Sequence, residues 1–232
     1  MRIAFMSDIH GNILALEAAY RSIKQKGAEK IYCAGDLVPF GPRPAEVVDF
    51  FINHDIETVL GNHDATIIGK ENIDSYIFKN DEERSYITDS IQRTSKDLTQ
   101  SHFDYLNALP EKIEASDRSL LLVHSVPDMC SYPDEKIISE YMKDSKYRFL
   151  FFGHSHTPRL YAMDNKKIAV SIPSIGKPKH GDPFAGYCIV EIENEHLYDL
   201  QFTFCEYDID VVCREITQRG FPQQTLKFLK YN

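Results

Sequence analysis

Compact apolar runs that end in short polar clusters recur along the first part of the chain. Residues 3–6 form such a run, and after a polar stretch apolar residues recur at helical spacing over 13–23. The same order repeats with a run at 30–34, a Pro- and Gly-rich loop, helical spacing to about residue 54 and a further run at 57–60. This alternation predicts strands joined by helices, and hence a parallel core whose loops lie at the carboxyl ends of its strands.

The rest of the chain departs from this alternation. Residues 67–109 are polar with few helix breakers, which predicts a helical excursion. Runs at 120–123 and 149–152 are typical of buried strands, whereas 160–205 contains short pieces with mixed alternation that favour antiparallel pairing. We therefore expect a mixed sheet, or one split into two, followed by a helix at 208–220.

Length and composition indicate a single globular domain over residues 1–232. Hydrophobic residues make up 43% of the chain and charged residues 26%, and no apolar run approaches the ~18 residues of a membrane span. The amino terminus enters directly into a predicted strand and leaves no room for a signal peptide, so we expect a cytoplasmic protein without membrane association. The sequence leaves open whether the chain forms a homo-oligomer.

The charge and the cysteines exclude several classes of partner and site. A net charge of −9 argues against a nucleic-acid polymer as partner, because such binding relies on clustered Lys and Arg. Bound divalent cations would offset part of this charge, so a small phosphorylated substrate remains compatible with it. The five cysteines are odd in number and contain no C-x-x-C pair, which argues against a disulfide framework or a thiolate zinc site.

Polar residues that can bind a metal follow the predicted strands. The candidate ligands are Asp8, His10, Asp36, Asn62, His124, His154 and His156. Taken alone, each cluster has a plainer explanation, such as a helix cap at Asp8 or Asn62 or a turn at Asp36. Their occurrence together, each at the end of a strand, favours a metal centre that a rigid sheet edge assembles.

Asp36 and His63 have distinct expected roles. Two cations held about 3.5–4 Å apart need an anionic ligand between them, and the carboxylate of Asp36, in the loop next to that of Asp8, suits this bridging position. His63 is expected to stay unligated and protonated, so that it meets a phosphoryl oxygen or the leaving group. Asp64 is expected to orient the His63 ring and to raise its pKa.

The order of these clusters is D-x-H, G-D, G-N-H-D, H and G-H-x-H over residues 8–156, and it resembles that of the calcineurin-like metallophosphoesterases. Segments 35–48 and 174–183 are similar to a bacterial and archaeal subgroup of small, phosphodiesterase-type members. The resemblance implies an α/β fold, a four-layer α/β/β/α sandwich of two mixed sheets flanked by helices. It also implies that His63 assists catalysis without binding metal.

The resemblance further implies how the ligands divide between two ions. One ion would be held by Asp8, His10, Asp36 and His156, and the other by Asp36, Asn62, His124 and His154. Rival hydrolytic sites are missing from the sequence, which has neither the H-x-H-x-D-H run of a metallo-β-lactamase nor the G-x-S-x-G elbow of a serine hydrolase.

The expected activity is metal-dependent hydrolysis of a phosphoric ester. Two cations would lower the pKa of a bridging water, and the resulting hydroxide would attack phosphorus in line. Several imidazoles near the site favour Mn or Fe over Mg, and Zn or Ni stays open. The favoured substrate is a phosphodiester, either nucleotide-like or a dinucleoside polyphosphate.

Substrate contacts and the alternative functions rest on weaker signals. The candidate substrate-binding residues are Arg43, Lys177, Lys179 and His180, for which solvated loop charge is the plainer explanation. A phosphomonoesterase, including a protein phosphatase, is the alternative within the same chemistry. A metal-binding scaffold protein without catalysis is the alternative from another class, although such a protein has no need of His63.

Overall fold

Two five-stranded sheets form the centre of the molecule. The structure is a computed structural model that describes residues 1–115, 119–126, 134–163 and 166–230. The first sheet contains, in spatial order, β10 (His196–Cys205), β9 (Ala185–Glu193), β1 (Arg2–Met6), β2 (Lys30–Cys33) and β3 (Glu57–Thr58). The second contains β4 (Lys112–Ala115), β5 (Leu120–Val123), β6 (Phe149–Phe152), β8 (Ile168–Ser171) and β7 (Arg159–Ala162).

Both sheets are mixed, as the sequence predicted. Strands β1, β2 and β3 run parallel in the first sheet, and β5, β6 and β8 run parallel in the second. The other neighbours pair antiparallel. The expectation of antiparallel pairing over 160–205 is therefore correct for β7, β9 and β10 but wrong for the pairing of β8 with β6.

The space between the sheets is filled by side chains from one face of each strand. Ile3 and Phe5 of β1 point into this space, while the alternate residues Ala4 and Met6 pack beneath helices. The rings of Phe5 and Phe151 stack with centroids 3.8 Å apart and so join the two sheets. Because side chains alternate across a strand, β1 is buried on both faces, which explains its uninterrupted apolar sequence.

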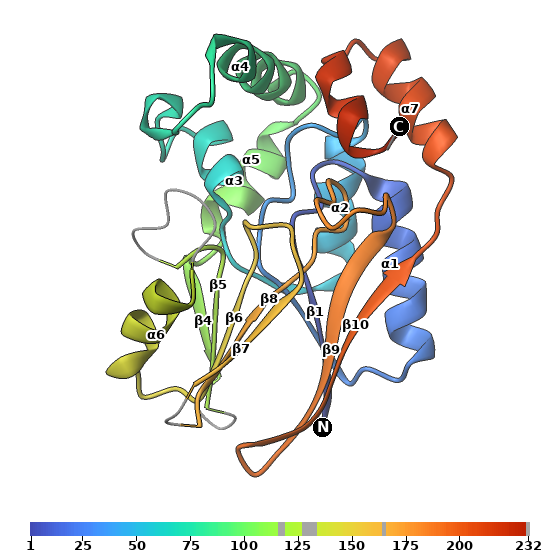
Figure 1. Ribbon diagram of the computed structural model, residues 1–232. Coiled ribbons are helices and arrows are strands. Elements are labelled where there is room, and N and C mark those ends of the chain that lie inside the picture. Colours follow the sequence, from blue (N-terminus) through green and yellow to red (C-terminus); the bar gives the residue numbers. More distant parts are fainter. Residues whose placement is uncertain (116–118, 127–133, 164–165, 231–232) are drawn as a thin grey trace.

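Helices cover both outer faces of the sandwich (Figure 1). The helical elements are α1 (Ile13–Gln25), α2 (Pro44–His54), α3 (Asn62–Ile67), η1 (Ile73–Ser75), α4 (Asp81–Ser95), α5 (Gln100–Ala108), α6 (Glu135–Lys143), α7 (Ile209–Gln218) and η3 (Gln223–Phe228). Helices α1, α2 and α5 contribute to the core outside the first sheet, and α6 packs outside the second. The four-layer α/β/β/α sandwich is thereby confirmed.

The sequence also predicted where most helices lie. Asn12 caps α1 by accepting a hydrogen bond from the Ala15 amide, and Pro44 occupies the first position of α2, where its missing N–H costs nothing. Regular structure between residues 67 and 109 is helical, as expected, and α7 forms near the predicted position. Within the described ranges, no helix combines the length and the apolar character needed to cross a bilayer. Cys130 lies outside the described residues.

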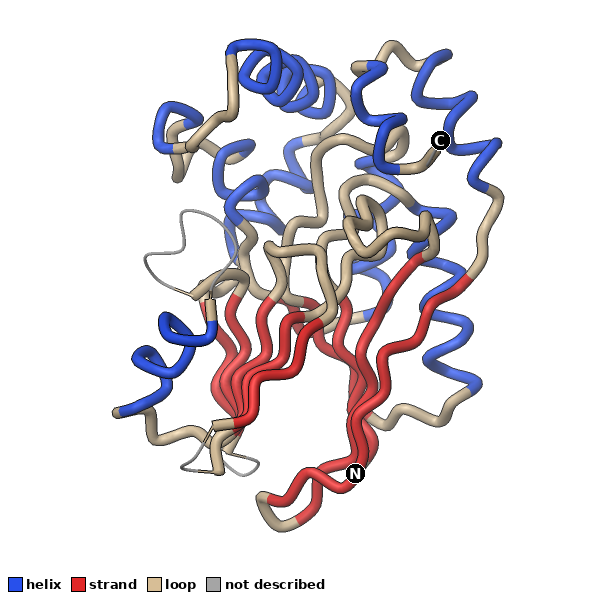
Figure 2. Tube along the Cα trace, in the orientation of Figure 1, coloured by secondary structure: helices blue, strands red, loops and turns tan. Residues whose placement is uncertain are grey.

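The loops that follow β1, β2, β5 and β6 gather at one end of the two sheets (Figure 2). Parallel strands of one sheet present their carboxyl ends at the same edge, so the polar clusters of the sequence are brought to this end. We refer to it as the carboxyl edge of the sandwich.

Candidate metal centre

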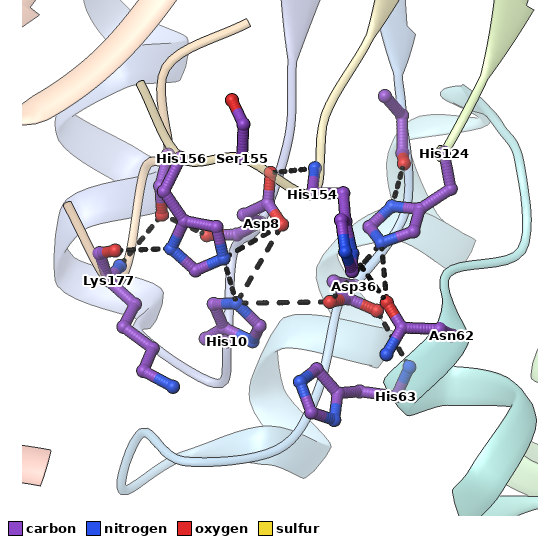
Figure 3. A network of polar contacts seen from close by, with 12 residues as sticks. Asp8, His10, Asp36, Asn62, His63, His124, His154, Ser155, His156 and Lys177 are labelled. Atoms are coloured by element: carbon purple, nitrogen blue, oxygen red, sulfur yellow. Dashed lines mark hydrogen bonds and ion pairs between the residues drawn. The ribbon is translucent and has the colours of Figure 1, made fainter. Parts of the chain in front are cut away.

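The seven candidate ligands meet at the carboxyl edge (Figure 3). Asp8 and His10 follow β1, Asp36 follows β2, Asn62 begins α3, His124 follows β5, and His154 and His156 follow β6. Both sheets therefore contribute to one cluster, although its members are spread over almost 150 positions of the sequence.

The loops of the cluster turn at the ligand residues themselves. Positive φ angles occur at Asp8 (55°), His10 (50°), Asp36 (55°), His154 (62°) and His156 (61°). Non-glycine residues in this left-handed region cost about 1–3 kcal/mol each and are concentrated at functional sites. Backbone hydrogen bonds fix the turns, since the amide of Asp8 donates to Gly35 O at 2.9 Å and that of His10 donates to Asp36 O at 3.0 Å. The loops after β1 and β2 therefore form one hydrogen-bonded unit.

Four side chains form what we call the first donor set: Asp8, His10, Asp36 and His156. Asp8 Oδ1 lies 3.2 Å from His156 Nε2 and 3.8 Å from His10 Nε2, and the two ring nitrogens are 3.2 Å apart. Asp36 Oδ2 lies 3.9 Å from His10 Nε2. Atoms that bind one ion at about 2.0–2.2 Å lie roughly 3–3.5 Å from one another. The contacts of His156 Nε2 with Asp8 and His10 match this spacing, and the distances from His10 Nε2 to the two carboxylates are slightly longer.

The second donor set consists of Asp36, Asn62, His124 and His154. Asn62 Oδ1 lies 2.9 Å from His124 Nε2 and 3.0 Å from His154 Nδ1. Asp36 Oδ2 is 3.4 Å from His124 Nε2. The same carboxylate oxygen of Asp36 thus faces both sets.

The outer nitrogens of two rings are held by backbone carbonyls. His124 Nδ1 donates to Ala34 O at 2.6 Å, and His156 Nδ1 donates to Lys177 O at 2.5 Å. In a neutral ring this leaves the lone pair on Nε2, which in both residues points into the cluster. Metal-binding histidines are usually oriented by this kind of bond.

Several acceptor atoms then face one another inside the cluster. Such acceptors repel one another, and a bound cation would remove this repulsion. Asp8 Oδ1 is buried and accepts no hydrogen bond from the described residues, yet it faces the lone pair of His156 Nε2. His124 Nε2 likewise faces the oxygens of Asn62 and Asp36. Buried acceptors without donors are costly, so the donor atoms fit bound cations.

The ionisation of the cluster points the same way. Burial opposes the charged form of Asp36, but His124, His63 and His10 outweigh it and hold its pKa well below the usual range. Burial also opposes a charge on His124, yet Asp36 raises the pKa of that ring to about 10. A positive charge beside the Asp36 carboxylate is therefore stabilised, whether it comes from a proton on His124 or from a bound cation.

The other rings of the donor sets remain neutral at physiological pH. Burial lowers the pKa of His154 to about 4. It also lowers the pKa of His156 and holds that of His10 well below its ordinary value. Neutral imidazole is the form that binds metal ions.

His63 lies beside both donor sets, but its surroundings differ from the prediction. Burial lowers its pKa to about 3, which favours the neutral ring over the protonated ring that was expected. Asp64 does not orient it, because the Asp64 carboxylate accepts hydrogen bonds from the amides of Leu37, Val38 and Gly61 at 3.1–3.2 Å. The ring nitrogen Nδ1 instead lies 3.2 Å from the hydroxyl of Tyr76.

Asp64 has a different place in the site. Burial and the nearby Asp36 raise its pKa to about 7. Its three amide partners come from the loop after β2 and from the residue that precedes α3. The side chain therefore joins the loop that carries Asp36 to the helix that carries Asn62 and His63.

A cavity of about 360 Å³ opens beside the donor sets. The cavity is lined by the polar site residues Asp36, Asn62, His63, His154 and His156, and also by Tyr76, Ile77, Ile87, Lys177 and Lys179. Lys177 is buried, and its ammonium lies 3.5 Å from the centre of the Phe40 ring. Two of the four predicted substrate residues thus reach the cavity.

The other two have different surroundings. The guanidinium of Arg43 forms a bidentate ion pair with Glu215 of α7, and His180 packs against the ring of Phe204 at 4.7 Å between centroids. Neither is among the described residues that line the cavity. In this structure the side chain of Arg43 faces α7 and that of His180 faces β10, so their substrate role stays a prediction.

Tyr76 and Phe40 are site residues that sequence reasoning missed. Tyr76 lies in the helical excursion with no neighbouring motif, and Phe40 belongs to the loop after Asp36. Aromatic residues in such segments usually serve packing, so only their contacts reveal them. No signal in the sequence singled out either one.

Known proteins resemble this chain over most of its length. The model of the calcineurin-like phosphoesterase superfamily domain matches residues 1–195, a range that contains both donor sets, His63 and Lys177. The uncharacterized protein MJ0912 of Methanocaldococcus jannaschii is 30% identical over 241 residues, with 95% of this chain and 94% of that protein covered.

Two solved structures share the fold over nearly the whole chain. A metallophosphoesterase from Sphaerobacter thermophilus has a TM-score of 0.77 at 25% identity, covering 99% of this chain and 98% of that one. The hypothetical protein PH1004 from Pyrococcus horikoshii OT3 has a TM-score of 0.84 at 21% identity, with the same coverage. The latter likeness concerns the fold alone.

Proposed function

Because the chain belongs to the calcineurin-like phosphoesterase superfamily, we propose that it hydrolyses a phosphodiester at a centre of two metal ions. The observation that carries the proposal is the pair of donor sets that share Asp36 Oδ2, which lies 3.9 Å from His10 Nε2 and 3.4 Å from His124 Nε2. A shared carboxylate oxygen is what a pair of cations about 3.5–4 Å apart requires.

The ions are assigned to the two donor sets. Asp8, His10, Asp36 and His156 would hold one, and Asp36, Asn62, His124 and His154 the other. When bound, the cations supply an activated water and withdraw charge from the phosphoryl oxygens. The donor atoms combine imidazole nitrogens with carboxylate and amide oxygens, which favours Mn or Fe, with Zn or Ni as further candidates.

The remaining polar side chains act on the substrate. His63 lines the cavity outside both donor sets, where its neutral imidazole would first take up the proton released by the attacking water and then pass that proton to the leaving oxygen. Lys177 and Lys179 line the same cavity. Burial lowers the pKa of Lys177, and a bound phosphate would favour the charged form of its amino group. The Asp64 carboxylate holds the loop of Asp36 and the start of α3 in register.

The cavity favours a small substrate with organic groups around its phosphate. Its volume of about 360 Å³ is at the lower end of the range for small-molecule sites, about 300–1,000 Å³. Tyr76, Ile77 and Ile87 add apolar surface to the lining that Lys177 and Lys179 share. A nucleotide-like diester, or a dinucleoside polyphosphate, presents a base to such a surface and phosphates to the lysines.

Paired substrates test this proposal. Protein stripped of metal by a chelator and reloaded with Mn²⁺ is given bis-p-nitrophenyl phosphate and p-nitrophenyl phosphate, and then a panel of nucleotides, dinucleoside polyphosphates and phosphopeptides followed by chromatography. We expect turnover only after metal is restored, with kcat/KM higher for the diester by about tenfold, or about 1.4 kcal/mol.

The other outcomes identify the alternatives. A preference for the monoester or for phosphopeptides would indicate a phosphomonoesterase and overturn the choice of a diester. Absence of metal-dependent turnover over the whole panel would overturn catalysis and leave a metal-binding scaffold.

A further inference from the structure

The hydroxyl of Tyr76 contacts three polar groups that surround the site. It lies 2.9 Å from Asn62 Nδ2, 3.2 Å from His63 Nδ1 and 2.8 Å from Thr66 Oγ1. Resting on the proposed function above, we propose that Tyr76 is a positioning residue that fixes both the orientation of the Asn62 carboxamide and the tautomer of His63. The nitrogen left to receive and deliver a proton at the cavity is then His63 Nε2.

The direction of each hydrogen bond follows from counting protons. Thr66 Oγ1 lies 3.0 Å from the carbonyl of Asn62, which can only accept, so the hydroxyl proton of Thr66 is used there. Thr66 must then accept from Tyr76, whose single proton is used in turn. The two lone pairs of the Tyr76 oxygen remain, and they accept from Asn62 Nδ2 and from His63 Nδ1. Each of these four hydrogen bonds then has one donor and one acceptor.

The first consequence concerns Asn62. Because its nitrogen donates to Tyr76, its oxygen is turned toward His124 and His154, as Figure 3 shows. A reversed carboxamide would place an N–H group where the second donor set needs an oxygen. Tyr76 therefore contributes to the affinity of the second ion without touching it.

The second consequence concerns His63. A proton on Nδ1 directed at Tyr76 leaves the lone pair of the neutral ring on Nε2. His63 lines the cavity, so a phosphate ester bound there meets a ring whose reactive nitrogen is already defined. Burial raises the pKa of Tyr76, which keeps its hydroxyl protonated over the pH range in which an enzyme assay is run.

Two features favour positioning over simple packing. Tyr76 immediately follows η1, outside the strand-end loops that hold the other polar residues of the site. It is partly exposed and lines the cavity, so burial of its ring is not its only contribution. Its hydroxyl nevertheless uses its full capacity, because it donates one hydrogen bond and accepts two.

The tautomer can be read directly from metal-free protein. Histidine labelled with ¹⁵N reports by NMR which ring nitrogen carries the proton, and the spectrum of His63→Gln identifies the signals of His63. At pH 8 we expect Nδ1–H in the wild type and a mixture of tautomers in Tyr76→Phe. Thr66→Val frees the Tyr76 proton to donate to His63 Nδ1, so this variant is expected to shift the ring toward Nε2–H.

Metal titration and kinetics complete the test. Tyr76→Phe is expected to weaken the second Mn²⁺ by about 10–100-fold, the usual effect of losing a group that orients a ligand, and to lower kcat more than it raises KM. Tyr86→Phe is the matched control, because the Tyr86 hydroxyl is buried in α4 without a hydrogen-bond partner among the described residues. Its tautomer spectrum and metal affinity should equal those of the wild type.

Each outcome decides the proposal. Nε2–H as the main tautomer in the wild type, or an unchanged tautomer and second-ion affinity in Tyr76→Phe, would overturn it. Altered tautomer and metal affinity in that variant would support it even if no substrate of the panel were hydrolysed, so a failure of the proposed activity would be seen separately.

Discussion

The carboxyl edge of the sandwich and the helical excursion over 67–109 contribute to the same cavity in different ways. At the edge, ligand residues occupy left-handed turns that backbone hydrogen bonds tie together, such as Asp8 N to Gly35 O. The excursion contributes side chains such as Tyr76 and Ile87, which reach the cavity from elements whose positions depend on packing. The edge therefore provides reactive groups of fixed geometry, and the excursion shapes and orients what surrounds them.

This difference has a physical basis in burial. The strand-end loops lie against two sheets, so most of their residues are buried on several sides. In α4, by contrast, only Tyr86, Ile87, Ser90 and Thr94 are buried. Substitutions at the carboxyl edge should change metal content and turnover, whereas substitutions of the cavity-lining residues outside it should change the affinity for substrate.

Removing the shared charge at the edge should have the largest effect. Asp36→Asn keeps the shape of the side chain but removes the anion between the donor sets, so we expect fewer than two equivalents of metal by elemental analysis. Turnover should fall by on the order of 10³-fold, since bound metals contribute several kcal/mol of charge stabilisation. Asp89→Asn, an exposed position in α4, is the control. Two full equivalents in Asp36→Asn would contradict the shared carboxylate.

Substitution of His63 tests whether every histidine at the carboxyl edge binds metal. His63→Ala should keep two metal equivalents while diester turnover in saturating Mn²⁺ falls by about 10²-fold, because only proton exchange is lost. The exposed His196 of the β9–β10 hairpin gives the control, His196→Ala. Unchanged turnover would remove His63 from the reaction, and loss of metal would move it into a donor set.

The smallest of these effects is expected for Lys177, which lines the cavity outside the donor sets. Lys177→Met keeps the apolar stem above Phe40 and removes the ammonium, so KM should rise by roughly tenfold, the cost of one charge-assisted hydrogen bond, with kcat little changed. Arg43→Met removes a positive charge that pairs with Glu215 and should leave KM as it was. Equal KM values for both variants would mean that Lys177 does not meet the substrate.

The strand-end ligands were predictable because the topology of a parallel sheet places them. A side chain directly after a buried run, such as His124 after β5, must lie at the carboxyl edge wherever the rest of the chain goes. The layers followed from the same runs. Strand β4 escaped prediction because it is only four residues long and three of them are not buried, so its apolar face consists of Ile113 and Ala115 alone. Helix α6 also escaped prediction, because its segment was not assigned a helical pattern of apolar residues.

Contacts between segments distant in sequence were not predictable. Asp64 neighbours His63 in the chain, which favoured a direct bond, but a helix start directs the two side chains apart and gives Asp64 the free amides of the loop after β2. Arg43 follows Asp36 closely, yet its partner Glu215 lies 172 residues away. Such pairings depend on where whole elements pack.

The three amides that Asp64 holds also have a consequence for motion. Leu37 and Val38 in the loop after β2 and Gly61 before α3 donate to one carboxylate, so opening either segment to solvent breaks hydrogen bonds to the same buried side chain. Local unfolding of the loop after β2 and of the start of α3 is thereby coupled into one cooperative unit. We therefore expect these three amides to exchange together in a hydrogen-exchange experiment, and the geometry of both donor sets to persist as long as this unit stays folded.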